Sequence, residues 1–247
     1  MPLKLRTQTP LPRRCLLYGT HGIGKTTWAS KLPSPLFVPT EDGLPHDVSS
    51  FSVAKTPKEF TSNLSDVLNE EHNFKTLVVD SADWLERLMA SKIAADNGVP
   101  NLGDIPYGRG TEKLVVAWNH VLGILEQIRS KGMAIIMLGH AQIKRFESPD
   151  ASAYDRYQPR MADKTSHLIQ EWCDEVLFVN YQVVAKKEKG KFGNERGIGI
   201  GDGERIVRTQ ERPAWVAKNR LALPLEIEFS PEAYTQHWPE LARKDQK

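Results

Sequence analysis

Residues 19–26 have the types and the spacing of a loop that binds phosphate groups. They read Gly-Thr-His-Gly-Ile-Gly-Lys-Thr, which matches the Walker A pattern G-x-x-x-x-G-K-T. Glycines let a backbone wrap closely around phosphate oxygens, and the N–H groups of the loop and of the helix after it supply positive dipoles. In this pattern Lys25 reaches the β- and γ-phosphates, and the hydroxyl of Thr26 ligates Mg²⁺. The sequence therefore predicts a site for ATP and Mg²⁺ formed by Gly19, Thr20, His21, Gly22, Ile23, Gly24, Lys25, Thr26 and Thr27.

The segments on either side of this loop fit the same interpretation. Residues 15–18 read Cys-Leu-Leu-Tyr, a short apolar strand, and residues 27–32 read as a helix that ends at Pro33. The alternative is a glycine turn that binds no ligand. A strand, a loop and a helix in this order favour the phosphate site over that alternative.

Asp80 ends an apolar segment, Leu-Val-Val-Asp, which is the Walker B pattern. The carboxyl ends of parallel strands are where α/β sheets place ligands, and a carboxylate there holds Mg²⁺ directly or through a water. The alternative is a helix N-cap, because a helical pattern begins at Ala82. Beside a complete Walker A loop we favour the metal role. We expect Asp83, in the first turn, only to complement the helix dipole.

Hydrolysis of ATP needs a group that activates or positions water near the γ-phosphate. Glu41 follows the short apolar segment after the first helix, so it should lie at the same edge of the sheet as the phosphate loop. Glu86 lies more than a turn beyond Asp80, within the following helix. We therefore predict that Glu41 is the catalytic carboxylate.

Two polar residues, His140 and Gln142, follow the apolar segment at residues 135–139. A polar side chain at the tip of a central strand can hydrogen-bond the γ-phosphate or the attacking water. Alternation along the strand puts both residues on one face. We predict that they sense the nucleotide, with ordinary loop polar residues as the alternative. A metal role for His140 is not supported, because no Cys or His lies at ligand spacing.

Composition sets broad limits. The chain has 247 residues, 40% of them hydrophobic, and a net charge of +2, so it can bury a sizeable core and any basic surface must be local. Cys15 and Cys173 lie in apolar segments, which favours buried thiols in a reducing compartment. The N-terminus has no apolar signal region, and no apolar run could span a bilayer. We expect a cytoplasmic protein without a membrane partner.

Apolar runs alternate with helical patterns, which predicts an α/β fold with a mostly parallel central sheet flanked by helices. Residues 96–110 and 142–164 are expected to be long loops, and the segment between them holds an amphipathic helix at 111–130 and a buried strand at 133–139. The last third predicts short antiparallel strands. We expect one domain over residues 1–247, with a core at about 12–230.

Together these residues resemble the RecA-like core ATPases, in which a Glu ends the strand after the P-loop helix and a polar sensor ends the strand after Walker B. Hexameric helicases of the DnaB type also carry a Lys-x-Arg pair late in the core. Lys218 and Arg220 match that pair. The resemblance implies that both are catalytic in trans, on the γ-phosphate of a neighbouring subunit, so that the ATP site lies at a subunit interface.

The short chain and the segment Gly-His-Ala-Gln at residues 139–142 are most similar to small phage ATP-binding proteins that anneal single strands. This resemblance covers roughly residues 12–230. Recombinases proper carry an additional domain that finds no counterpart here, so full strand exchange does not follow from it.

The polar segment at residues 142–164 mixes cationic and aromatic side chains. Cations can track a phosphate backbone while aromatic faces stack on bases. Acidic residues bring the local charge near zero, so a subunit-contact loop is the alternative. Tyr107 and Arg109 form a second aromatic–cation pair, and residues 186–191 form a basic turn that is expected to be solvated. The residues predicted to contact single-stranded DNA are Lys144, Arg145, Tyr154, Arg156, Tyr157 and Arg160.

These observations favour an ATPase that binds single-stranded DNA in phage recombination or repair. A helicase-like or helicase-loading ATPase of phage replication is the alternative, and directional unwinding would favour it. A small-molecule kinase would need a lid with arginines, whereas the Lys-x-Arg pair lies on a late strand.

Overall fold

The computed structural model describes residues 11–150, 152–182, 184–189, 195–200 and 203–238. The helices are α1 (Lys25–Ala29), α2 (Pro57–Asn69), α3 (Ala82–Asp96), α4 (Arg109–Ser130), α5 (Asp163–Trp172) and α6 (Pro231–Thr235), with 3₁₀ turns η1 (Leu102–Asp104) and η2 (Pro106–Gly108). The strands are β1 (Arg14–Gly19), β2 (Pro35–Pro39), β3 (Ser49–Ser50), β4 (Thr76–Asp80), β5 (Ala134–Phe146), β6 (Tyr154–Pro159), β7 (Glu175–Tyr181), β8 (Val184–Lys189), β9 (Glu195–Ile200), β10 (Arg205–Arg208), β11 (Lys218–Asn219) and β12 (Glu226–Glu228).

The central sheet has the strand order β12-β10-β7-β1-β5-β4-β2-β3. The six strands from β7 to β3 in this order are mutually parallel. Strands β10 and β11 pair antiparallel with β7, and β12 pairs antiparallel with β10. The predicted parallel α/β sheet with flanking helices is therefore confirmed, and the antiparallel strands of the last third extend it on one side.

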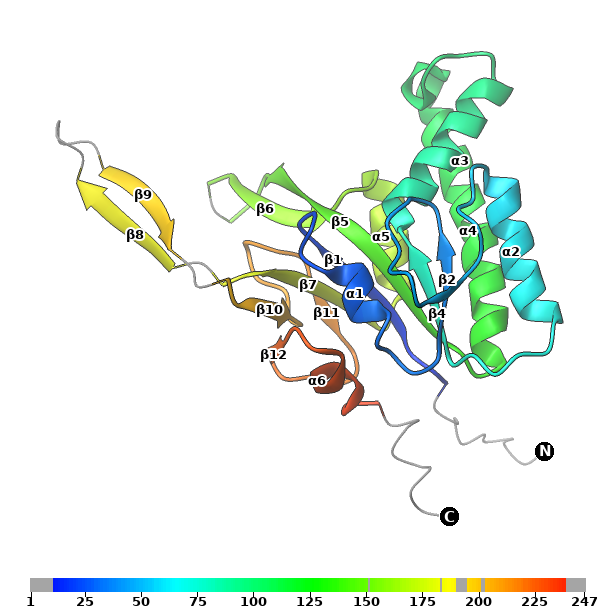
Figure 1. The fold of residues 1–247 in the computed structure, drawn as a ribbon. Coiled ribbons are helices and arrows are strands. Elements are labelled where there is room, and N and C mark those ends of the chain that lie inside the picture. Colours follow the sequence, from blue (N-terminus) through cyan, green and yellow to red (C-terminus); the bar gives the residue numbers. More distant parts are fainter. Residues whose placement is uncertain (1–10, 151, 183, 190–194, 201–202, 239–247) are drawn as a thin grey trace, which may run out of the picture.

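Apolar side chains form a layer on each face of the sheet, because successive residues of a strand point to opposite faces. Leu16 and Tyr18 of β1 pack in one layer with side chains from α2, α3, α4 and α5. Cys15 and Leu17 of the same strand pack in the other layer with α1 and α6. Figure 1 shows α2, α3 and α4 side by side on one face of the sheet, with α1 and α6 on the other.

Strand β5 runs far past the sheet, which corrects the prediction of a strand at 133–139 followed by a long loop. Its outer part pairs antiparallel with β6, from Ala141 opposite Pro159 to Phe146 opposite Tyr154. The hairpin projects beyond the sheet in Figure 1. The prediction failed because alternating polar and apolar residues on a ribbon that is partly exposed on both faces resemble a loop.

Two smaller expectations also need correction. The predicted loop at 96–110 holds η1 and η2, and α4 begins at Arg109 rather than at residue 111. The predicted basic turn at 186–191 lies partly in β8, which pairs with β9 as a separate hairpin. The rest of that predicted turn falls outside the described residues.

The C-terminal helix α6 is fixed to the sheet by buried charges. Arg13 pairs with Glu175 at 3.2 Å, and the hydroxyl of Tyr234 donates to the same carboxylate at 2.5 Å. The Arg13 guanidinium also stacks over the rings of Tyr234 and Trp238. Among the described residues, no helix is long and apolar enough to cross a membrane.

Candidate functional site

The loop between β1 and α1 has the backbone conformation that its glycines predict. Gly24 has a φ of 98°, in the left-handed region that residues with a Cβ rarely adopt. A Cβ on Gly19 would lie 2.4 Å from the carbonyl oxygen of Val179, so the loop begins where β1 and β7 approach closely. Glycine is therefore required at both positions for the loop to curve over the end of β1.

Lys25 is buried at the base of this loop. Its Nζ donates to the carbonyl oxygens of Gly19 at 3.3 Å and of Thr20 at 3.0 Å. Burial lowers the pKa of Lys25, and the charge of Arg160 lowers it further against the opposing effect of Asp80. The ammonium group is thus held inside the loop by weak acceptors, where a phosphate would be a stronger partner.

Asp80 and Thr26 meet at the carboxyl end of β4. The Thr26 hydroxyl donates to Oδ2 of Asp80 at 2.8 Å. Burial raises the pKa of Asp80 to about 6, and the nearby charge of Glu41 contributes to this shift. Both predicted metal ligands therefore lie together, on β4 and at the start of α1, with a carboxylate that is costly to keep charged without a cation.

Glu41 lies beside this pair. Its neighbour Thr40 donates its backbone N–H to the carbonyl oxygen of Asp80 at 2.7 Å and its hydroxyl to that of Ser81 at 2.9 Å. These bonds fix the chain at the point where it leaves β2. Glu41 then lines the same cavity as Lys25 and Asp80, as a base acting there would have to.

The cavity over the loop measures about 320 Å³. It offers cationic and N–H donors from the loop and oxygen ligands from Thr26 and Asp80. The hydroxyl oxygen of Thr20 is buried without a hydrogen-bond partner among the described residues. These groups fit a nucleotide with its Mg²⁺. The cavity is lined by His21, Gly22, Gly24, Lys25, Thr26, Thr27, Glu41, Asp42, Gly43, Asp80 and His140.

Glu86, the alternative catalytic carboxylate, is occupied by hydrogen bonds that hold helices together. It accepts hydrogen bonds from the indole of Trp118 at 3.0 Å, the backbone N–H of Ala162 at 2.7 Å and the hydroxyl of Thr165 at 2.5 Å. These donors belong to α4 and to the start of α5. Burial raises the pKa of Glu86. Glu86 therefore joins three helices and does not line the cavity.

His140 lines the cavity, and it belongs to a polar cluster. Its ring stacks on that of His21 with the centroids 5.5 Å apart, and its Nδ1 lies 3.1 Å from the Asp83 carboxylate. Asp83 also accepts two hydrogen bonds from Arg160. Asp83 was expected only to complement the helix dipole, but its carboxylate is buried and also binds side chains far away in sequence.

Gln142 does not line the cavity, which corrects its predicted role there. Its amide donates to the carbonyl oxygens of Pro159 at 3.1 Å and Met161 at 3.4 Å. These contacts tie β5 to the last residue of β6 and to the segment that follows it. Gln142 therefore stabilises the base of the hairpin, two residues beyond His140.

The six residues predicted to contact DNA fall into two groups. Three are engaged by other parts of the protein and are not displayed as expected: Arg156 pairs with Glu211 at 2.6 Å, Tyr157 stacks on Phe178, and Arg160 binds Asp83. They are held because the hairpin packs against the C-terminal segment and α3. Lys144, Arg145 and Tyr154 remain on the outer part of the hairpin.

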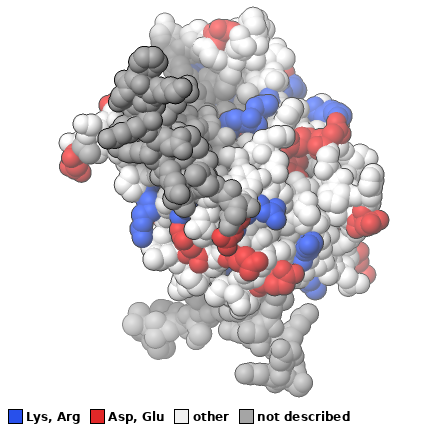
Figure 2. All heavy atoms as spheres, turned by 60° about the vertical axis from the view of Figure 1, so that its left-hand side comes forward, with Lys and Arg blue, Asp and Glu red and all other residues white. Residues whose placement is uncertain are grey.

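The exposed part of the hairpin combines charge with apolar surface. Ile143 is 62% exposed and Phe146 is 37% exposed, and the ring of Phe146 lies 5.4 Å from that of Tyr154. Lys144 of the hairpin pairs with Asp163, the first residue of α5. Figure 2, which views the side of the molecule that carries β8 and β9, shows cationic and anionic side chains interspersed. The described surface on this side is therefore not a uniformly basic one.

Lys218 and Arg220 have different environments. The Nζ of Lys218 donates to the carbonyl oxygens of Gln170, Glu171 and Cys173, at 2.7, 2.9 and 2.6 Å. All of its donors are used to cap α5, so Lys218 is not free to reach a phosphate, and its predicted catalytic role is corrected. Arg220 is exposed next to β11, which pairs with the first residues of β7, at the opposite edge of the sheet from the Walker A loop.

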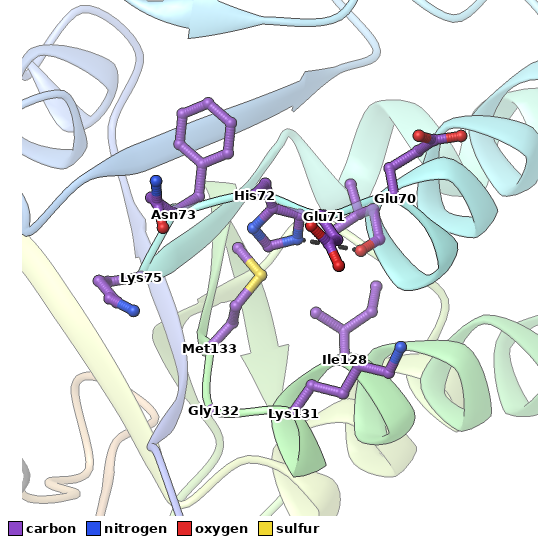
Figure 3. A pocket seen from close by; sticks show the side chains of 11 residues that line it. Glu70, Glu71, His72, Asn73, Lys75, Ile128, Lys131, Gly132 and Met133 are labelled. Carbon is purple, nitrogen blue, oxygen red and sulfur yellow. Dashed lines mark hydrogen bonds between the residues drawn. The ribbon is translucent and has the colours of Figure 1, made fainter.

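A larger cavity of about 520 Å³ lies away from these residues. It is formed between the segment that joins α2 to β4 and the turn that joins α4 to β5 (Figure 3). Figure 3 shows His72 and Met133 pointing toward each other, with Lys75 and Lys131 at the margin. The His72 ring bonds the carbonyl oxygen of Val67 at 3.0 Å. This cavity lies at the amino ends of β4 and β5, so it is separate from the nucleotide cavity.

Sequence reasoning missed the cluster of Asp83 and Arg160 next to His140, and the contact of Arg205 with the loop. Arg205 of β10 donates to the carbonyl oxygen of Ile23 at 3.0 Å and stacks over Phe229, which supports the loop from outside. Its pairing spans 182 residues, and no local pattern signals such a contact.

The parallel sheet, the glycine-curved loop after β1 and the paired Thr26 and Asp80 define a P-loop nucleotide-binding protein. In agreement, residues 11–221 match the protein family described as AAA domain, and the chain belongs to this family. Membership supports a nucleotide-hydrolysing P-loop ATPase that binds a nucleotide, usually with Mg²⁺. No curated protein matches the sequence.

Proposed function

We propose that this protein hydrolyses ATP with Mg²⁺ and binds single-stranded DNA in phage recombination or repair, where it anneals complementary strands. The observation that carries the proposal is the continuity of β5. His140 lines the nucleotide cavity, and Phe146 lies six residues further along the same strand, about 20 Å away at the usual rise per residue. One element thus reaches from the nucleotide to an exposed aromatic and cationic surface.

The chemistry proposed for the cavity follows from its lining. Lys25 binds phosphate oxygens, while Thr26 and Asp80 hold Mg²⁺. Bound Mg²⁺ neutralises charge on the phosphates. Glu41 accepts the proton of the attacking water. His140 and Asp83 keep the polar wall of the cavity rigid through their mutual bonds.

The proposed DNA surface is the outer half of the hairpin. Lys144 and Arg145 supply positive charge, and Tyr154 with Phe146 supplies faces on which bases can stack. Single strands are favoured because stacking needs unpaired bases. Salt bridges of Lys144 and Arg145 with acidic neighbours are exposed, so phosphates can compete for these cations.

Self-association is part of the proposal. Arg220 is exposed, and among the described residues no hydrogen bond or ion pair engages its side chain. Arg220 follows β11 at the amino end of β7, whereas its own Walker A loop lies at the carboxyl end of β1, so a contact with a γ-phosphate would be made at the ATP site of a neighbour. Lys218 positions this segment by capping α5.

The test is ATP turnover by the purified protein with and without single-stranded DNA across a salt series, together with an annealing assay on complementary strands. We expect DNA to stimulate turnover, ATP to raise DNA affinity, and annealing without directional unwinding. Directional unwinding would favour the helicase-like alternative. If DNA neither binds nor changes turnover at low salt in any nucleotide state, the proposed function is wrong.

A further inference from the structure

Arg160 is held at the edge of the nucleotide cavity by a buried carboxylate. Its Nε and Nη2 donate to Oδ2 of Asp83 at 3.1 and 2.6 Å. The side chain of Asp83 is 1% exposed, whereas that of Arg160 is 37% exposed. The other oxygen of Asp83 accepts from the backbone N–H of His140 at 3.1 Å. Asp83 thus fixes the guanidinium beside a residue that lines the cavity.

The contacts of Arg160 with Asp83 and His140 place it next to the nucleotide cavity, because His140 lines that cavity. Burial lowers the pKa of Lys25, and the charge of Arg160 also lowers it, against the larger opposing effects of Asp80 and Asp83. The backbone N–H of Arg160 also donates to the carbonyl oxygen of His140 at 2.8 Å. A phosphate bound over Lys25 would offer this guanidinium a second anionic partner besides Asp83.

The guanidinium keeps unused donors. Arginine has five N–H groups, and Asp83 engages Nε and Nη2. Nη1 has no hydrogen-bond partner among the described residues. Arg160 can therefore bind a phosphate oxygen through Nη1 without giving up its bonds to Asp83.

We propose that Arg160 contacts the terminal phosphate of the nucleotide bound in its own subunit, and that Asp83 is the positioning residue that holds it there. This inference rests on the proposed nucleotide site. Because Arg160 directly follows β6, the same contact links the terminal phosphate to the returning strand of the hairpin. It also replaces the sequence-based prediction that Arg160 binds DNA.

The experiment measures the dissociation constants of a non-hydrolysable ATP analogue and of ADP by calorimetry. We expect Arg160→Ala to weaken binding of the triphosphate about tenfold or more, the scale of a lost charge-assisted hydrogen bond, and to leave that of ADP nearly unchanged. Arg160→Lys should restore part of the difference, since it keeps the charge without the fork. Asp83→Asn should weaken triphosphate binding less, as its amide oxygen still accepts one bond.

Arg87→Ala is the matched control, because Arg87 is an exposed arginine on α3 that stacks over Trp84. It should change neither constant. Melting temperatures identify any variant that fails to fold, and Arg160→Lys, which preserves the charge next to Asp83, serves as the second variant in that case.

Affinity for single-stranded DNA without nucleotide gives an independent readout. Arg160→Ala should leave it unchanged. Unchanged triphosphate binding in Arg160→Ala would overturn the inference. A loss of DNA affinity with unchanged dissociation constants for both nucleotides would overturn it too. In both cases the proposed function would stand. If the wild-type protein binds neither nucleotide, the proposed function itself fails, and this inference fails with it.

Discussion

The hydroxyl of Thr26 and the carboxylate of Asp80 are joined by a 2.8 Å hydrogen bond across 54 residues of sequence. The bond connects the first turn of α1 to the end of β4. The two oxygens proposed as Mg²⁺ ligands are therefore already side by side, in a buried setting where burial raises the pKa of Asp80 to about 6. A preorganised pair of this kind spares the cost of ordering the ligands on binding.

Lys25→Ala should abolish binding or hydrolysis of ATP, because the substitution removes the cation inside the loop. The fold should persist, since the lysine bonds only two carbonyl groups of its own loop. Asp80→Ala should weaken binding only where Mg²⁺ is present. Calorimetry with and without Mg²⁺, with a melting curve for each variant, measures both effects. Wild-type turnover in Lys25→Ala would refute the assignment of the loop.

Glu41→Gln should retain ATP binding and lower turnover by about two orders of magnitude or more, the scale for loss of a general base. Glu86→Gln is the informative comparison. Its amide places an N–H₂ group among three hydrogen-bond donors, so it should lower the melting temperature. If Glu86→Gln is stable and inactive while Glu41→Gln hydrolyses normally, the carboxylates have been assigned in the wrong order.

Arg220→Ala should bind nucleotide normally and lose most of its turnover, because an arginine supplied in trans stabilises charge in the transition state. Mixing it with Lys25→Ala should restore part of the activity, since each variant supplies what the other lacks. Lys218→Ala, by contrast, should lower the stability of the protein, because three carbonyl groups at the end of α5 lose their donor. A monomeric protein with full turnover would exclude this arrangement.

The hairpin should bind DNA through its outer residues. Replacing Lys144 and Arg145 together with alanine should reduce the slope of DNA affinity against salt, since fewer phosphates are neutralised. Tyr154→Ala should weaken binding with less change in slope, because stacking is not ionic. Lys92→Ala, an exposed lysine on α3, is the charge control. Equal salt slopes in all of these proteins would show that DNA does not use the hairpin.

Acid should destabilise the protein partly through Asp174. Burial alone would raise the pKa of this carboxyl, but the hydrogen bond and charge of Arg14 and the charge of Arg129 outweigh it and lower the pKa. A carboxyl whose pKa is lowered by folding contributes stability above its unfolded value of about 3.9, and this contribution is lost as the pH falls through the folded pKa.

Asp174→Asn should therefore be less stable than the wild type at pH 7, by roughly 1–3 kcal/mol. The difference should shrink as the pH falls below about 4. Urea unfolding at several pH values measures it. Parallel stability curves for the two proteins would mean that Asp174 makes no such contribution.

Local patterns predicted the parts of the molecule that depend on local rules. The Walker A loop and the segment ending at Asp80 could be recognised from their residue types and spacing. Because the strands that precede them are parallel, Glu41 and His140 lie at the same edge of the sheet. The roles of Lys218 and Arg160 could not be predicted in this way. Each is decided by partners 45 or more residues away, the end of α5 for one and Asp83 for the other.

The two halves of β5 differ in what restrains them. Its inner half is paired with β1 on one side and β4 on the other, whereas beyond Ala141 its only strand partner among the described residues is β6. The outer half is therefore held mainly through β6, which Arg156 and Tyr157 fix to the C-terminal segment. If the strand tilted near His140, the displacement of its residues would grow with distance from His140 and would be largest toward Phe146. DNA bound at that end would then move farther than His140 in the nucleotide cavity.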